Sequence, residues 1–247
     1  MLIVANWKAY VEERTKAKKL FSLAKQLARL TGINIVLAPP APLLGALAVR
    51  NTSSVAFAAQ DVSRTTGGAK TGEVTAQAYA ATGATYAIVG HSERRAAGDT
   101  DAIVAEKLTH ALAHGLTPIL CIGESERDGE GRYLAVVREE LTTAIESLAP
   151  KERANVIIAY EPIWAIWKTD AAAIEPSDLA EMVLYIRKVL AELLPGKSSA
   201  HSLVLYGGSV EPENVRTLAG NTGIDGLLVG HTSVDPRTFS LLVKHLS

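Results

Sequence analysis

The sequence predicts a single α/β domain over residues 1–247, folded as a (β/α)8 barrel. Short apolar runs alternate eight times with longer amphipathic stretches, and no linker or change of composition interrupts them. The length is close to the roughly 250 residues typical of such barrels. Eight such units can also form an open, doubly wound sheet, but the G-x-G-x-x-G pattern of dinucleotide-binding folds is missing after the first run.

The apolar runs are the predicted strands. They are rich in Val, Ile and Leu and nearly unbroken, which is typical of strands buried on both faces of a parallel sheet. In chain order they are Leu2–Ala5, Ile33–Ala38, Val55–Ala59, Tyr86–Val89, Thr117–Ile122, Val156–Tyr160, Leu203–Tyr206 and Gly226–Val229.

The amphipathic stretches are the predicted helices. Four of them begin with a proline, which is favoured in the first turn of a helix. The predicted helices cover Glu12–Leu30, Pro42–Val49, Thr75–Thr82, Asp101–His114, Arg132–Leu148, Pro176–Leu194, Pro212–Ala219 and Pro236–Leu246.

Composition argues against several kinds of partner and site. Lysine plus arginine (25) nearly balances aspartate plus glutamate (26), so no surface for nucleic acid or an anionic membrane is expected. Cys121 is the single cysteine, which excludes an intramolecular disulfide and disfavours a metal site. No apolar run approaches the ~18 residues of a membrane-spanning helix. The first residues, MLIVANWK, do not resemble a signal peptide. We therefore expect a cytoplasmic protein without a metal or cofactor.

Polar residues gather where the predicted strands end. In (β/α)8 barrels the active site lies at the carboxyl ends of the strands. These ends carry Asn6 and Lys8, His91, Glu161, Gly207–Ser209 and Gly230–His231. Singly, each has an ordinary explanation, such as a solvated lysine, a helix-capping histidine or a glycine turn. Together they predict one site with a base, an imidazole, a cation, an amide and two glycine turns.

Five segments resemble the triosephosphate isomerase family in order and spacing, and the resemblance extends over essentially the whole chain. The segments are Asn6–Lys8, Ile88–Arg95, Ile119–Glu124, Ala159–Ile166 and Leu205–Val210. The resemblance implies a TIM-barrel aldose–ketose isomerase without a cofactor. Its substrates would be dihydroxyacetone phosphate and glyceraldehyde 3-phosphate.

The resemblance also implies roles for the strand-end residues. A carbon-bound proton beside a carbonyl is weakly acidic, so a base and donors for the oxygen are needed. Glu161 would carry the proton, and His91 would donate to the oxygens as neutral imidazole. Ser92–Arg95 can form a short helix, whose positive end disfavours a charged His91.

Other residues would support this pair. Lys8 supplies a fixed positive charge and Asn6 a neutral donor. Glu93 is expected to pair with Lys8 and orient it. Ser92 and Cys121 are expected next to the catalytic groups.

Backbone N–H groups are expected to bind the substrate phosphate, because turns after the last two strands often do so in this fold. The predicted residues are Gly208, Ser209, Gly230 and His231. Trp167 matches the lid position whose N–H reaches the phosphate in the family.

The lid departs from the family pattern. Residues 167–176 form a longer segment than usual and contain no glycine, a residue that eases backbone rearrangement. A lid excludes water and protects the intermediate, so we expect slower or leakier isomerisation. Smaller departures are Ala9-Tyr10, Asp61 and His231.

Gln60–Val74 is a long predicted loop, and long loops in compact domains are usually functional. In the family it reaches into a second subunit. Thr71 and Glu73 match its contact positions, and Arg94 is expected at the same interface. This predicts a homodimer, whereas the alternative is a mobile surface loop.

Two other functions stay open. The chain could be a catalytically silent barrel that serves as a binding protein, since fold does not fix function. It could also act on another sugar phosphate. A Schiff-base aldolase would need a lysine at a central strand end, where this chain has Glu161.

Overall fold

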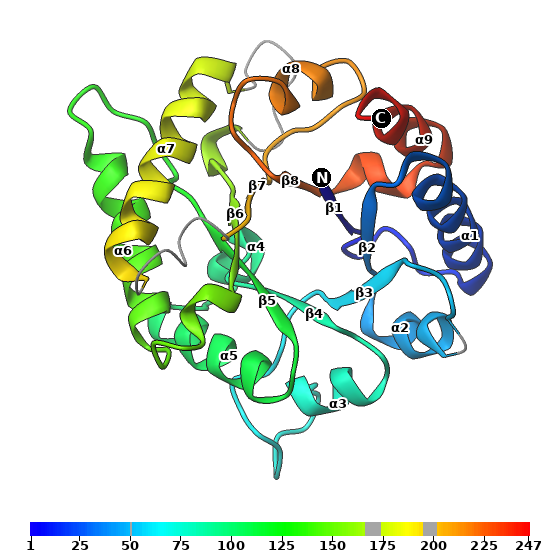
Figure 1. Ribbon diagram of the computed structural model, residues 1–247. Helices are drawn as coiled ribbons and strands as arrows, with labels where there is room; N and C mark the ends of the chain where they lie inside the picture. Colours follow the sequence, from blue (N-terminus) through cyan, green and yellow to red (C-terminus); the bar gives the residue numbers. More distant parts are fainter. Residues whose placement is uncertain (50, 166–173, 195–201) are drawn as a thin grey trace.

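Eight parallel strands form a closed barrel ringed by helices (Figure 1), as the sequence predicts. The computed structural model describes residues 1–49, 51–165, 174–194 and 202–247. Each strand pairs with the next along the chain, and β8 closes the barrel against β1. The strands are β1 (Leu2–Asn6), β2 (Asn34–Ala38), β3 (Ala56–Ala59), β4 (Tyr86–Val89), β5 (Thr117–Ile122), β6 (Ile157–Tyr160), β7 (Val204–Tyr206) and β8 (Gly226–Val229).

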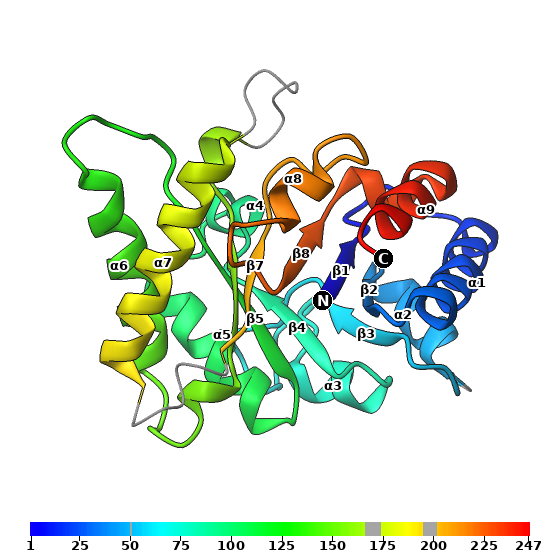
Figure 2. The ribbon, with the colours of Figure 1, turned by 45° about the horizontal axis from the view of Figure 1, so that its top comes forward.

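Helices cover the outside of the barrel, with α6 and α7 along one flank and α1 and α9 along another (Figure 2). The helices are α1 (Arg14–Thr31), α2 (Ala41–Ala48), α3 (Ala76–Ala81), α4 (Ser92–Ala96), α5 (Asp101–Ala113), α6 (Arg132–Glu146), α7 (Pro176–Leu193), α8 (Val215–Ala219) and α9 (Pro236–His245). Short 3₁₀ turns at Arg153–Asn155, Ile163–Ala165 and His231–Val234 were not predicted.

Side-chain caps explain several helix starts. Thr75, Thr100 and Asp235 each accept a hydrogen bond from a backbone N–H in the first turn of the helix that follows. Such caps satisfy N–H groups that lack a partner within the helix. Gly32 ends α1 in the left-handed conformation with φ 71°, which glycine adopts without steric cost.

The prediction of a helix from Pro212 is wrong in its first turn, because α8 begins at Val215. The preceding residues form a turn instead. Asn214 Oδ1 accepts a hydrogen bond from the Glu211 N–H at 2.9 Å, and the Val215 N–H donates to the Glu211 carbonyl at 3.0 Å. Proline suits the start of a turn as well as the start of a helix, so the sequence signal is ambiguous here.

The core has two parts that follow from the alternation of side chains along a strand. One set fills the barrel interior, and a larger set packs between the strands and the helices. The interior set consists of Leu2, Val4, Val36, Ala38, Ala58, Ile88, Ile119, Cys121, Ile157, Ala159, Leu205 and Leu228. Positions that continue this alternation at the carboxyl ends of the strands open into the barrel mouth.

Candidate active site

Two polar side chains continue the barrel interior at its carboxyl end. In β1 and β6 the preceding alternate residues belong to the interior cluster. Asn6 and Glu161 are the next members of these two series, so they face the same space. Both residues are buried, with 5% and 3% of their surface exposed. They line one pocket together with Lys8 and His91.

Glu161 is held by groups that follow β4. Its Oε1 lies 3.4 Å from His91 Nε2, and its Oε2 accepts a hydrogen bond from the Ser92 backbone N–H at 3.2 Å. On another side lies Gly207, where a Cβ would come within 2.8 Å of Glu161 Cγ. A side chain at position 207 would therefore displace the carboxylate.

His91 has a geometry that fixes its tautomer. It caps α4, and its Nδ1 accepts a hydrogen bond from the Glu93 backbone N–H at 3.1 Å. A ring nitrogen that accepts a hydrogen bond carries no proton, so the proton of the imidazole lies on Nε2. Nε2 faces Glu161. His91 thus presents a neutral N–H donor beside the carboxylate.

Lys8 has a strained backbone that its neighbours hold. Its φ is 45°, a left-handed value that is costly for a residue with a side chain. Its N–H donates to Asn6 Oδ1 at 3.1 Å, and its carbonyl accepts from Gln60 Nε2 at 2.9 Å. Its ammonium Nζ lies 2.7 Å from Glu93 Oε1. These contacts fix a positive charge at the pocket.

The turns after β7 and β8, together with Leu228 of β8, form one wall of the pocket. This wall contains Gly207, Gly208, Ser209, Val210, Leu228, Gly230, His231 and Thr232. A Cβ on Gly208 would overlap the Tyr206 hydroxyl, so packing against Tyr206 requires glycine at this position. His231 opens a 3₁₀ turn, and its Nε2 lies 2.8 Å from Glu211 Oε1.

Sequence reasoning missed Val210, Leu228 and Thr232, which also line this wall. Leu228 stands two positions before Gly230, so the strand alternation was a usable signal for it. Val210 and Thr232 lie in turns, where no such period exists. Their side chains carry no chemistry that would single them out.

Cys121 lies behind the pocket rather than in its lining. It is buried, and this burial together with the neighbouring Glu161 carboxylate raises the pKa of its thiol well above the ordinary value. Cys121 therefore stays a neutral thiol near the carboxylate, as a packing residue.

The chain that leads from Glu161 toward the lid is fixed by a buried carboxylate. Glu124 Oε1 accepts hydrogen bonds from the Tyr160 hydroxyl and from Trp164 Nε1, both at 2.8 Å. Arg127 stacks over Trp164 with its guanidinium carbon 5.6 Å from a ring centroid. Trp167 and residues 166–173 of the lid lie outside the described residues.

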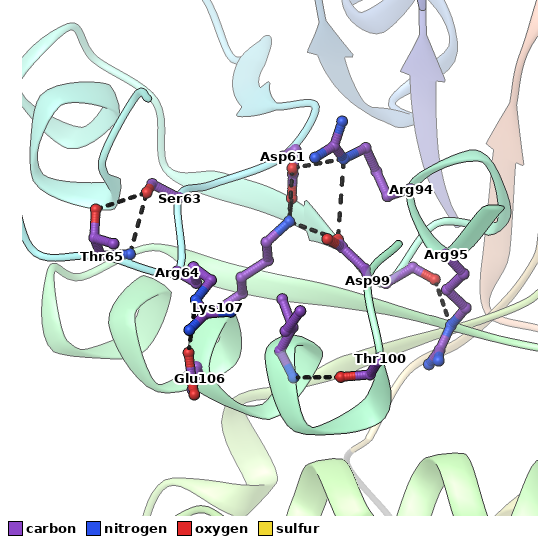
Figure 3. A network of polar contacts seen from close by, with 12 residues as sticks. Asp61, Ser63, Arg64, Thr65, Arg94, Arg95, Asp99, Thr100, Glu106 and Lys107 are labelled. Atoms are coloured by element: carbon purple, nitrogen blue, oxygen red, sulfur yellow. Dashed lines mark hydrogen bonds and ion pairs between the residues drawn. The ribbon is translucent and has the colours of Figure 1, made fainter. Parts of the chain in front are cut away.

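A charged network behind α4 ties it to the loop after β3 (Figure 3). Lys107 is buried, with 3% of its surface exposed, and its Nζ bonds both oxygens of Asp61 at 2.8 Å and Asp99 Oδ2 at 2.5 Å. Arg94 Nε lies 2.8 Å from Asp61 Oδ2. Burial raises the pKa of Asp61 although Lys107 and Arg94 oppose this effect.

The loop that leaves this network projects from the rim of the barrel (Figure 1). Residues 66–74 are all exposed, including Thr71 and Glu73. Neither residue lines the pocket of its own chain. Arg94 belongs to the base of the loop through Asp61.

Within the described part of the chain, no group of three or more His, Cys, Asp or Glu residues is arranged to hold a metal ion. No described helix is both long and apolar enough to cross a membrane.

A closed parallel barrel with a carboxylate, a neutral imidazole and an ammonium at its carboxyl end defines a (β/α)8-barrel protein with an enzyme-like site. Sequence comparison gives the family. A model of the triosephosphate isomerase family matches residues 1–246. The chain belongs to this family of isomerases.

Individual relatives agree over nearly their whole length. The chain is 38% identical over 244 residues to the triosephosphate isomerase of Symbiobacterium thermophilum. The matched region covers 98% of this chain and 94% of the relative. It is 39% identical over 247 residues to that of Chloroflexus aurantiacus, with 99% and 98% covered. It is 38% identical over 247 residues to that of Thermus thermophilus, with the same coverage of 99% and 98%.

Proposed function

We propose that this protein interconverts dihydroxyacetone phosphate and glyceraldehyde 3-phosphate through an enediolate. The observation that carries the proposal is the pairing of a buried carboxylate with a neutral N–H donor: Glu161 Oε1 lies 3.4 Å from His91 Nε2 in one pocket. A base and an acid at this distance can act on neighbouring carbon and oxygen atoms. The same pairing is the established chemistry of this family.

Glu161 removes the proton from the carbon beside the carbonyl and returns it to the neighbouring carbon. Negative charge then develops on the substrate oxygens. The Nε2–H of His91 and the Lys8 ammonium stabilise this charge, with Asn6 as a further donor. Removing one such donor from a water-poor site typically costs about 3 kcal/mol of transition-state stabilisation. Ser92 holds Glu161 through its N–H, and Glu93 holds both Lys8 and His91.

The phosphate binds at the wall formed by the turns after β7 and β8, to backbone N–H groups of Gly208, Ser209, Gly230 and His231. Support comes from their place, because all four residues line the pocket in the turns after β7 and β8, and turns at this end of the fold often bind phosphate. The His231 side chain is engaged with Glu211, so its role here is through the backbone. Trp167 of the lid would add a further N–H.

The lid segment 167–176 contains no glycine, and we propose that it closes less well than a glycine-containing lid. An enediolate exposed to water can eliminate phosphate and give methylglyoxal. We expect measurable methylglyoxal and inorganic phosphate per turnover, and less of both in Trp167→Gly. Negligible release at a high turnover rate would show that this lid closes properly.

We also propose a single domain over residues 1–247 that acts in the cytoplasm as a homodimer and needs no metal or cofactor. Thr71 and Glu73 of the projecting loop would contact the partner subunit near its pocket. Arg94 would support the loop through Asp61.

The deciding test is an isomerase assay, coupled to an auxiliary dehydrogenase, on the wild-type protein beside Glu161→Asp. The shorter side chain keeps the charge but withdraws the base, so kcat should fall by about 100-fold or more. Equal rates in the two proteins would contradict the assignment of Glu161 as the base. A folded wild-type protein with no isomerase activity would favour the catalytically silent binding protein.

A further inference from the structure

A buried ion pair lies behind the pocket and outside its lining. Arg95 of α4 and Glu140 of α6 meet with Nη1 3.5 Å from Oε1, and their side chains are 16% and 11% exposed. Removing two charges from water is costly, and their mutual attraction often fails to offset the cost. Stability alone is therefore a weak explanation for this pair.

Arg95 reaches the backbone just before His91. Its Nε donates a hydrogen bond to the Gly90 carbonyl at 2.9 Å. Gly90 has a φ of 76°, and a Cβ there would lie 3.1 Å from the Cys121 carbonyl oxygen. This glycine turns the chain out of β4 and sets the direction in which His91 points. Arg95 thus anchors the turn that aims the imidazole.

Glu140 reaches the backbone packed against Glu161. Its Oε2 accepts a hydrogen bond from the Gly123 N–H at 2.8 Å. A Cβ on Gly123 would overlap the Glu161 carbonyl oxygen, so the two backbones are in direct contact. The neighbours of Gly123 hold the same stretch, because Glu161 N–H donates to the Ile122 carbonyl at 2.8 Å.

We propose that Arg95 and Glu140 are positioning residues that together set the distance between His91 and Glu161. Their ion pair links the turn before the imidazole to the backbone beneath the carboxylate. Neither side chain touches the pocket, so both act through the groups they hold. The kinetic consequence rests on the proposed function, whereas the geometric consequence does not.

Arg95 has a second carboxylate partner, so the loss of charge pairing can be separated from the loss of the link to Gly123. Asp101 of α5 lies 2.5 Å from Arg95 Nη1, and its side chain is 34% exposed. Without Glu140, the Arg95 charge still has this carboxylate. What is lost is the connection to Gly123 and hence to Glu161. Substitutions at position 140 therefore test the link itself.

The experiment compares Glu140→Leu, which removes acceptor and charge, with Glu140→Gln, which keeps an oxygen for the Gly123 N–H. Crystal structures should show the His91 Nε2 to Glu161 Oε1 distance wider in Glu140→Leu than in wild type and intermediate in Glu140→Gln. We expect kcat to fall about 10- to 100-fold in Glu140→Leu, since small displacements of reacting groups cost this much. KM should stay within about twofold, because the phosphate wall is untouched.

Glu139→Leu and Glu139→Gln are the matched controls, since Glu139 is the exposed neighbour on the same helix. A role in folding alone would lower the melting temperature but leave kcat, measured well below it, and the His91–Glu161 distance unchanged. That result would overturn the proposal. If the wild-type protein proves inactive, the proposed function fails. The His91–Glu161 distance in the crystal structures still shows whether Arg95 and Glu140 set the geometry. If Glu140→Leu does not fold, Glu140→Gln and Arg95→Lys provide the same measurements.

Discussion

Gly207 makes room for the proposed base by having no side chain. A Cβ there would lie 2.8 Å from Glu161 Cγ and 3.3 Å from its Oε1. We expect Gly207→Ala to push the carboxylate away from its place beside His91 and to lower kcat about 10- to 100-fold without unfolding the protein. The isomerase assay measures this. Gly129→Ala is the matched control, because a Cβ at Gly129 meets nothing within 4 Å.

The crystal structure of Gly207→Ala supplies the complementary observation. If its carboxylate kept the wild-type position and kcat were unchanged, the close approach would not be what holds Glu161 in place.

Glu140 makes stability depend on pH near neutrality. Burial raises the pKa of its carboxyl from 4.5 to about 7, although Arg95 and the Gly123 N–H oppose this effect. The folded protein therefore holds this proton more tightly than the unfolded chain. The resulting stabilisation is full below about pH 4.5 and is lost as the pH rises through about 7, a change of roughly 3 kcal/mol.

Glu140→Gln cannot ionise, so we expect it to lack this loss. In urea unfolding, its free energy of unfolding relative to wild type should rise between about pH 5 and about pH 8. Glu139 is exposed, so the free energy of unfolding of Glu139→Gln should follow that of the wild type at every pH. A constant difference between Glu140→Gln and wild type would mean that Glu140 does not titrate in this range.

At the scale of an element, α4 shows how a short helix can be made rigid. It has five residues, too few to be stable alone. His91 caps it, Arg95 fixes it to Gly90, and Arg94 fixes it to Asp61. Its stability is therefore supplied by side chains that reach other parts of the barrel.

Lys107→Met should lower the free energy of unfolding by breaking the charged network behind α4. The change leaves the Asp61 and Asp99 carboxylates without their buried ammonium partner, which typically costs about 3–5 kcal/mol. Urea unfolding measures the loss. Lys244→Met, at an exposed position of α9, is the control. A loss under about 1 kcal/mol would mean that water or Arg94 replaces the ammonium.

The elements were largely predictable because their signals are local. Nearly unbroken apolar runs gave every strand to within a residue, and β4, β5 and β8 have the expected bounds. The candidate site was predictable in outline because parallel strands bring their carboxyl ends together. Arg95 and Glu140 left no such signal, since they lie on different helices and meet only in the folded chain. No helical or strand periodicity of the sequence predicts that these two charged side chains are buried.

At the scale of the whole molecule, the projecting loop is the feature that an isolated barrel does not explain. Residues 66–74 are exposed, while the base of the loop is fixed by the ion pair of half-buried Asp61 with buried Lys107. A loop held rigidly at its base and exposed at its tip is suited to insertion into another surface. With the family relationship, this supports a second copy of the chain as the partner.

Sedimentation tests the homodimer directly. We expect wild type to sediment with twice its chain mass of 26.2 kDa at micromolar concentration. Thr71→Arg should shift the protein toward the monomer, because a large charged side chain at a packed contact must be desolvated and accommodated. On a free loop the same change would be harmless. Thr52→Arg, at another exposed loop position, is the control and should leave the mass unchanged. A wild-type protein that sediments as a 26.2 kDa monomer would contradict the dimer. The loop would then be a surface loop without a partner subunit.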